Sequence, residues 1–333
     1  MNNETRFPVV IYRPKPSDFK KINALITEAI RTALRMEGVR KEVIDHYMPA
    51  AGELEFSGTA GKSLVAQMNK SVNAVGFMWI YLDESTLIQR YASIAASRLL
   101  QKAKNGDYHY PAEMMLECLS IYSEREQVAS LDDVRALSLY QLRIEIEMEG
   151  YEIWRRVLVP STYSFRHLHK IIQTVFDWQN YHLHMFEAKK TGAKVKEIVA
   201  DDDPETLEWI DLDLYDILQE RFTALEDIFP DHEEVVYEYD FGDSWRHKII
   251  LEKVVQADSF RASFLEGVGE RPPEDVGSSW GYHEYKRVMA NPYDPEYESM
   301  KLWSESQKER VFSKERINDR LEQVILGYEY YYR

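Results

Sequence analysis

Residues 237–247 of the chain read YEYDFGDSWRH and place three carboxylates, one imidazole, one guanidinium and four aromatic rings around a single glycine. Apolar side chains alternate with other residues up to this glycine, which predicts a half-buried strand through Val235, Tyr237, Tyr239 and Phe241. Residues 241–244 predict a tight turn in which Gly242 adopts a positive φ, and residues 249–251 predict a second strand. A turn needs only glycine and one short polar residue, so Trp245 and His247 beside two aspartates indicate a site at the tip of a hairpin.

The composition indicates an ordinary globular protein with more than one core. The chain has 333 residues, of which 44% are hydrophobic and 29% charged, and this length is sufficient for two domains. It contains no apolar run near the ~20 residues of a membrane helix and no secretory signal. The single cysteine, Cys118, excludes an internal disulfide and a Cys-rich zinc site. We therefore expect a cytoplasmic protein in which Cys118 is a buried structural thiol.

The net charge of −16 is unevenly distributed. Residues 1–130 hold 16 basic and 15 acidic side chains, whereas residues 131–333 hold 25 basic and 42 acidic ones. An acidic domain repels the phosphate backbone of nucleic acids. The sequence therefore disfavours a dedicated duplex-DNA binder and is compatible with a metal ion or a basic partner.

The pattern of elements predicts two α+β domains, residues 1–130 and residues 131–333, joined near a charged segment at 123–137. In the first domain we expect an amphipathic helix from Ser17 to Gly38, a helix beginning at Pro111, and further elements at 7–12 (strand), 54–56 (strand), 75–82 (strand) and 85–104 (helix). In the second we expect a mixed sheet with packed helices. Its strands are predicted at 142–148, 153–159 and 181–188 and its helices at 164–176, 214–221 and 304–327, with a Gly/Pro-rich loop at 267–281.

The second domain resembles the plasmid pRiA4b ORF-3-like family, whose members also occur as passenger proteins of insertion elements. Four ordered motifs carry the resemblance: Tyr239–His247, Ile153–Val157, Leu168-His169 with Phe176–Phe186, and Pro272–Gly277 with Trp280–Tyr282. The resemblance implies a compact α+β domain and brings no established activity. The family pattern has a further glycine where Ser278 stands. Residues 62–69 and 108–113 resemble an uncharacterised bacterial domain found on plasmids.

Carboxylates and imidazoles are concentrated in these motifs, and both are ligands of Zn, Mn or Fe. We take Asp240, Asp243, His247 and Glu274 as candidate ligands of a divalent metal, although no cofactor is firmly implied. His182 and His184 alternate on a predicted strand, so both can face one ion. The wider candidate pocket consists of Asp240, Asp243, Trp245, His247, Glu274, Asp275, Trp280, Tyr282, His169, Trp178, His182 and His184. The alternative is that Asp240 and Asp243 cap the turn, His247 pairs with a carboxylate, and His169 is a satisfied core histidine.

Basic and aromatic residues alternate in the same domain. Arginine and lysine beside tryptophan and tyrosine can hold the phosphates and stack the bases of a single strand. The candidate contacts are Arg155, Arg156, Arg166 and Lys170. The alternative is an aromatic core with basic side chains at its edge.

Three functions are compatible with these features. The first is a cytoplasmic, non-catalytic binding protein associated with mobile elements, which recognises a protein, a single-stranded nucleic acid or a small ligand through an acidic and aromatic pocket. The second is a metal-assisted hydrolase or nuclease that uses Asp240, Asp243, His247 and Glu274. The third is a purely structural interaction domain.

Overall fold

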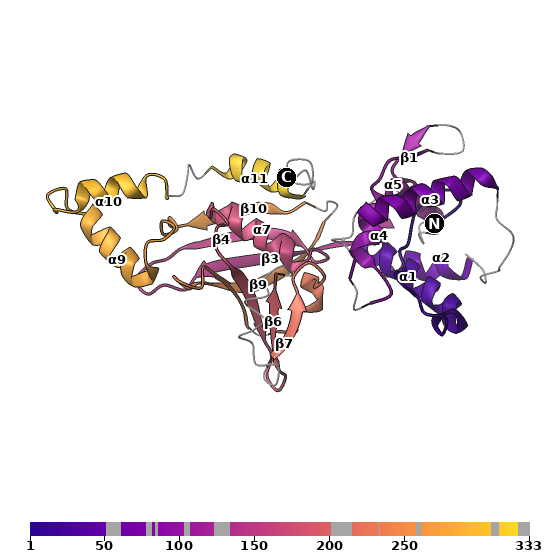
Figure 1. The fold of residues 1–333 in the computed structure, drawn as a ribbon, viewed down its shortest axis with the longest axis horizontal. Coiled ribbons are helices and arrows are strands. Elements are labelled where there is room, and N and C mark those ends of the chain that lie inside the picture. Colours follow the sequence, from indigo (N-terminus) through magenta and orange to yellow (C-terminus); the bar gives the residue numbers. More distant parts are fainter. Residues whose placement is uncertain are drawn as a thin grey trace. The chain divides into compact units, whose positions relative to one another are not determined.

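The computed structural model divides into two compact units, Met1–Leu137 and Ser138–Arg333 (Figure 1). The residues that it describes are 1–50, 61–77, 82–83, 86–102, 107–122, 134–200, 215–232, 234–257, 261–307 and 313–325. Within these residues no helix is both long and apolar enough to cross a membrane.

The described part of the first unit is mainly helical. Its elements are η1 (Asp18–Lys21), α1 (Ile22–Met36), α2 (Lys41–Ala50), α3 (Lys62–Phe77), α4 (Arg90–Ser97), β1 (Gln101–Lys102), β2 (Tyr108–His109), α5 (Pro111–Leu119) and η3 (Ser120–Tyr122). The apolar face expected for α1 packs through Ala33 and Leu34 into a core that also includes Val43, Met115 and Leu119. The expected helix start at Pro111 is confirmed.

Several expectations for this unit are wrong. Residues 7–12 form only an isolated bridge between Ile11 and Ile88, and residues 75–77 belong to α3. The helix expected at 85–104 is reduced to α4, because Gln101 pairs with His109 in a short hairpin. Short apolar runs fit a helix or a strand equally well, and tertiary contacts decide between them. Cys118 is exposed rather than buried, and residues 54–56 lie outside the described residues.

The second unit is built on one eight-stranded sheet of order β10-β4-β3-β9-β8-β5-β6-β7. The strands are β3 (Leu137–Ile146), β4 (Trp154–Pro160), β5 (His184–Lys189), β6 (Val195–Val199), β7 (Tyr215–Gln219), β8 (Glu234–Tyr239), β9 (Trp245–Ala257) and β10 (Ser263–Val268). The helices are α7 (Phe165–Phe176), η4 (Leu225–Asp227), α9 (Ser278–Met289), α10 (Tyr297–Ser304) and α11 (Lys314–Ile325). The α+β class and the mixed sheet expected from the sequence are therefore present.

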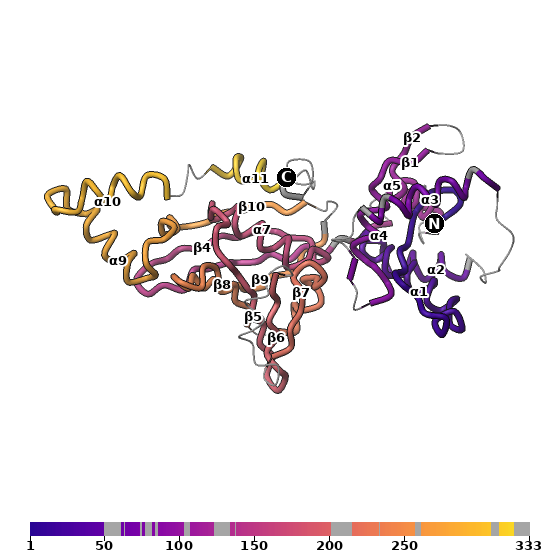
Figure 2. Tube along the Cα trace, viewed as in Figure 1, coloured from indigo at the N-terminus to yellow at the C-terminus, as the bar shows by residue number. Residues whose placement is uncertain are grey.

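β7 is the main departure from the predicted order of elements. Residues 214–221 were expected to form a helix, whereas Tyr215–Gln219 pair in parallel with β6 at the edge of the sheet. Figure 2 follows the chain from β5 through β6 to this edge. The ends of the loop expected at 267–281 are taken up by β10 and α9. Of the helix expected at 304–327, Ser304 is the last residue of α10 and Lys314–Ile325 form α11.

α7 lies across one face of the sheet (Figure 1) and supplies much of the core. Ser164 and His167 form a capping box at its start, which satisfies backbone groups that a helix leaves free. Apolar side chains at helical spacing then enter the core, where Phe165, Leu168, Ile172 and Phe176 are fully buried. The helix ends at Asp177, which adopts a left-handed φ of 55°.

Two buried arginines hold the carbonyl groups at the end of α7. Arg155 Nε donates to Val175 O over 2.9 Å. Arg271 donates from Nε to Phe176 O over 3.0 Å and from Nη2 to Asp177 O over 2.7 Å, and its Nη1 reaches Gln307 O at 2.8 Å. The last carbonyls of a helix have no partner within it and lie at the negative end of its dipole. Arg271 therefore fixes three segments of the chain at one point.

Arg271→Met should destabilise the C-terminal domain by roughly 3 kcal/mol or more, because it leaves several buried carbonyl groups without donors. Chemical denaturation measures the loss. The matched control is Arg287→Met, since the side chain of Arg287 is 56% exposed and pairs with Glu284 and Asp294, so this variant should lose no more than about 1 kcal/mol. Equal stability of the two variants would contradict the role assigned to Arg271.

Candidate ligand-binding site

The hairpin turn at residues 240–244 is organised by Asp240 rather than by glycine. Asp240 adopts a left-handed φ of 60°, and its Oδ1 accepts hydrogen bonds from the backbone N of Gly242 at 3.0 Å and of Asp243 at 3.3 Å. Aspartate tolerates this conformation because its short carboxylate can satisfy nearby amides. Gly242 has no positive φ, so the expectation for Gly242 is wrong. Asp240 Oδ2 is left to face away from the turn.

The loop at residues 271–278 meets this turn, as expected from the polar residues that both carry. Asp243 Oδ2 accepts a hydrogen bond from the backbone N of Gly277 at 3.0 Å. Within the loop, Asp275 and Ser278 have left-handed φ values of 56° and 64°. The strained value at Ser278 explains why a glycine suits this position in the family pattern. The loop also packs so closely on α9 that a Cβ at Gly281 would collide with the carbonyl of Val276.

A third segment, residues 177–183, enters the site from the end of α7. The backbone N of Gln179 donates to Glu274 Oε1 at 2.6 Å, and the backbone N of Tyr181 donates to Tyr239 Oη at 3.0 Å. A further bond joins Asp240 N to Leu183 O at 2.9 Å. These bonds place the side chain of His182 between the hairpin turn and the loop.

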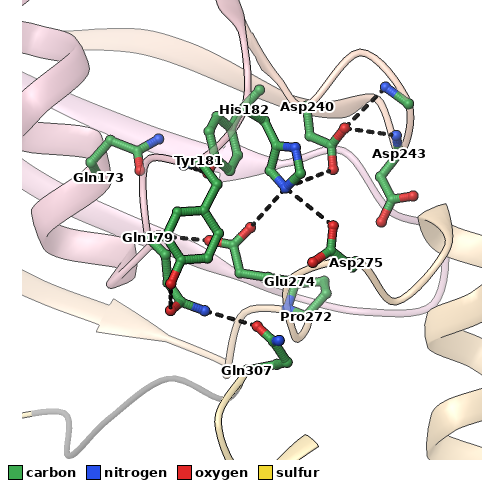
Figure 3. Close-up of polar contacts among 12 residues, drawn as sticks. Gln173, Gln179, Tyr181, His182, Asp240, Asp243, Pro272, Glu274, Asp275 and Gln307 are labelled. Atoms are coloured by element: carbon green, nitrogen blue, oxygen red, sulfur yellow. Dashed lines mark hydrogen bonds and ion pairs between the residues drawn. The ribbon is translucent and has the colours of Figure 1, made fainter. Parts of the chain in front are cut away.

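Three carboxylates surround the imidazole of His182 (Figure 3). Its Nε2 lies 3.2 Å from Asp275 Oδ1, 3.5 Å from Asp240 Oδ2 and 3.9 Å from Glu274 Oε2. We call these four residues the acidic site. Neither His182 Nε2 nor Glu274 Oε2 has a hydrogen-bond partner among the described residues, although both atoms are buried. Glu274 is fully buried, whereas Asp275 is 54% exposed, so the site opens to solvent on the side of Asp275.

Carboxylates outnumber the basic groups that contact them in the acidic site. Burial raises the pKa of Glu274, while the amide of Gln179 and the positive charge of Arg271 act in the opposite direction. Among the described residues, the ion pairs found at Asp240, Glu274 and Asp275 are those with His182. Several carboxylates held together with one imidazole repel one another unless a proton or another cation joins them.

His247, a candidate metal ligand, lies outside the acidic site and inside the core. Its Nε2 accepts a hydrogen bond from Trp178 Nε1 at 3.1 Å, and its Nδ1 donates to Trp245 O at 2.8 Å. Burial lowers its pKa to about 4. Both ring nitrogens are thus occupied and the ring is neutral, so the assignment of His247 as a metal ligand is wrong. Asp243 binds Gly277 N and does not join the group of potential ligand atoms either.

His169, which is buried, and His184, which is half-buried, form a separate pair. Their rings stack with centroids 3.6 Å apart. His184 Nε2 bonds Glu220 Oε2 at 2.9 Å, and His169 Nδ1 bonds Tyr237 Oη at 2.9 Å. Burial holds the pKa of His169 well below its usual value. His184 therefore does not share an ion with His182, because its Nε2 is engaged by Glu220.

The expected aromatic pocket divides between core and surface. Trp178, Trp245 and Tyr282 are buried in the hydrophobic core, which confirms the alternative interpretation for these three rings. Trp280 is 78% exposed on the first turn of α9. Gln179 and Gln307 also lie at the site and were not expected there. Gln179 Nε2 donates a hydrogen bond to Gln307 Oε1 at 2.9 Å. No local pattern indicates that contact, which joins residues 128 positions apart.

The basic residues proposed to contact nucleic acid do not form an open patch. Arg155 is fully buried beneath α7, so its assignment to phosphate contact is wrong. Arg156 pairs with Glu252 at 2.6 Å and also with Glu266. Arg166 and Lys170 lie half-buried on α7. A guanidinium that already binds two carboxylates has little to offer a phosphate.

A single α+β domain with an open cluster of carboxylates and imidazole is thus defined, and comparisons identify its family. The plasmid pRiA4b ORF-3-like protein family matches residues 138–320, more than half of the chain, and the chain belongs to that family. A domain of unknown function, DUF6933, matches residues 1–114.

The chain is also similar to two individual proteins. Uncharacterized protein y4hQ of Sinorhizobium fredii is 32% identical over 156 residues, which is 46% of this chain and 75% of that protein. The crystal structure of a protein of unknown function, MM3350 from Methanosarcina mazei Go1, is 33% identical and is matched with a TM-score of 0.47, covering 54% of this chain and 97% of that one.

The buried neutral His247 should make the domain sensitive to acid. Below pH ~6.5 the unfolded chain binds a proton at this position, whereas the folded state does so only near its pKa of about 4. Stability is therefore lost as the pH falls through this window. Between pH 7.5 and 5 the wild type should lose about 2 kcal/mol more than His247→Gln, measured by denaturant unfolding at both values. Parallel losses in the two proteins would contradict a neutral buried imidazole.

Proposed function

We propose that the protein is a non-catalytic binding protein whose C-terminal domain recognises a cationic ligand at the acidic site. The observation that carries this proposal is His182 Nε2 facing three carboxylate oxygens at 3.2–3.9 Å, without a hydrogen-bond partner among the described residues. A ligand that brings positive charge would relieve the repulsion among Asp240, Glu274 and Asp275. A phosphate-bearing ligand would increase it.

Two exposed aromatic rings near the acidic site also favour a positively charged ligand. Tyr181 and Phe241 are the chain neighbours of His182 and Asp240, and they are 66% and 39% exposed. Exposed aromatic rings beside carboxylates favour cations, because the ring face is electron-rich. We also propose that the protein is cytoplasmic, on the basis of its composition. An association with mobile elements is proposed from the plasmid origin in the family's name.

A second candidate is metal-assisted hydrolysis, and Glu274 is the observation that favours it. A buried carboxylate with a raised pKa beside an open site is suited to accept a proton from water. His247 was a candidate residue for this function, but it takes no part in it because both of its ring nitrogens are bound within the core.

A panel of cations tests the proposed function on the full chain. The panel contains divalent metal ions, spermidine and a lysine-rich peptide, and each is followed by the shift in melting temperature that ligand binding produces. At least one class should raise the melting temperature of the wild type and leave the Asp240→Asn/Asp275→Asn variant unchanged.

The matched control is Asp216→Asn, which removes one carboxylate from an exposed position of β7 in the same domain. This control should respond to the cations like the wild type. A panel in which no cation shifts the wild type, or in which the double variant responds equally, would contradict cation recognition at the acidic site.

A further inference from the structure

We infer that the cation held at the acidic site is a divalent transition metal ion, bound by His182 Nε2, Asp240 Oδ2 and Asp275 Oδ1. This inference rests on the proposed function and names its ligand. The three atoms lie within 4.8 Å of one another and come from three segments that the fold brings together: the end of α7, the hairpin turn and the loop before α9.

The distances from His182 Nε2 to the two aspartate oxygens are close to those between neighbouring ligands of a metal ion. Metal bonds to imidazole and carboxylate are ~2.0–2.2 Å long, so neighbouring ligands at tetrahedral or octahedral angles stand ~3.0–3.4 Å apart. His182 Nε2 lies 3.2 Å from Asp275 Oδ1 and 3.5 Å from Asp240 Oδ2. The two aspartate side chains, whose ligand atoms lie within 4.8 Å of each other, would draw together around an ion held by all three residues.

Glu274 is the independent observation that points to a ligand. Its side chain is fully buried, its Oε2 has no hydrogen-bond partner among the described residues, and this atom is directed at His182 Nε2 from 3.9 Å. An unsatisfied buried carboxylate oxygen is costly in a folded protein. A metal ion, or a water bound to it, would supply the missing partner.

Two of the carboxylates are oriented in advance. Asp240 Oδ1 is held by the amides of Gly242 and Asp243, which leaves Oδ2 toward His182. Glu274 Oε1 is held by Gln179 N, which leaves Oε2 toward His182. In each case one oxygen is anchored by backbone and the other is presented to the site. Anchoring of this kind fixes the direction of a metal ligand and strengthens binding.

The donor set selects among metal ions. Imidazole nitrogen suits zinc, copper, nickel and iron, whereas calcium and magnesium prefer oxygen ligands alone. No thiolate competes for the ion in this domain, since the one cysteine of the chain is Cys118. Three protein ligands leave positions open on the ion, which allows it to hold a further ligand from solution.

Zinc titration of the untagged full chain, freed of metal with a chelator, tests the inference by calorimetry. The wild type should bind one zinc ion per chain, and calcium and magnesium should bind at least about tenfold more weakly. Asp275→Asn and His182→Gln should each weaken zinc binding at least about tenfold. Asp216→Asn is the control and should bind zinc like the wild type.

The melting temperature of each metal-free variant shows whether it folds. Two ligand variants are used so that the test still holds if one of them fails to fold. Zinc binding of equal strength in wild type, Asp275→Asn and His182→Gln would overturn the inference, because the ion would then lie elsewhere. If the wild type binds spermidine or the lysine-rich peptide at this site but no metal ion, the inference of a metal ligand is wrong and the proposed cation recognition stands. A wild type that binds none of these cations would overturn both the metal inference and the proposed cation recognition.

Discussion

The site depends on the buried guanidinium of Arg271. It satisfies carbonyl groups of Phe176, Asp177 and Gln307, which belong to segments far apart in the chain. Its positive charge lies at the end of α7, where the helix dipole is negative. This arrangement fixes the point at which the chain leaves α7 and the point at which the loop toward α9 begins. The two segments that carry His182 and Glu274 therefore start from one rigid centre.

From that centre, backbone amides direct the side chains. Asp240 and Asp275 both occupy the left-handed region, a conformation that is costly outside glycine and is often found at functional sites. One oxygen of Asp240 and one of Glu274 are bound to amides, and the other oxygen of each faces His182. The result is concentrated negative charge in a rigid frame.

The sequence predicted the features that depend on local pattern. The hairpin, α7 and the start of α5 follow from alternation, helical spacing and capping residues, and the motifs identified the family. β7 was missed because Tyr215–Gln219 suits either a helix or a strand and its pairing with β6 is set by the sheet. The partner of His247 is Trp178, which is 69 residues away in the chain. Local sequence gives no sign of this contact, so His247 was taken for a metal ligand. Asp240, Glu274, Asp275 and His182 were all expected in the pocket, but only the three-dimensional arrangement shows that His182 stands at its centre.

The location of a bound ion tests this account most directly. Crystals of the full chain grown or soaked with zinc would be measured on both sides of the zinc absorption edge. The account predicts one strong anomalous peak within about 2.2 Å of His182 Nε2, Asp240 Oδ2 and Asp275 Oδ1. An acidic site without a peak, while zinc occupies other positions on the molecule, would contradict it.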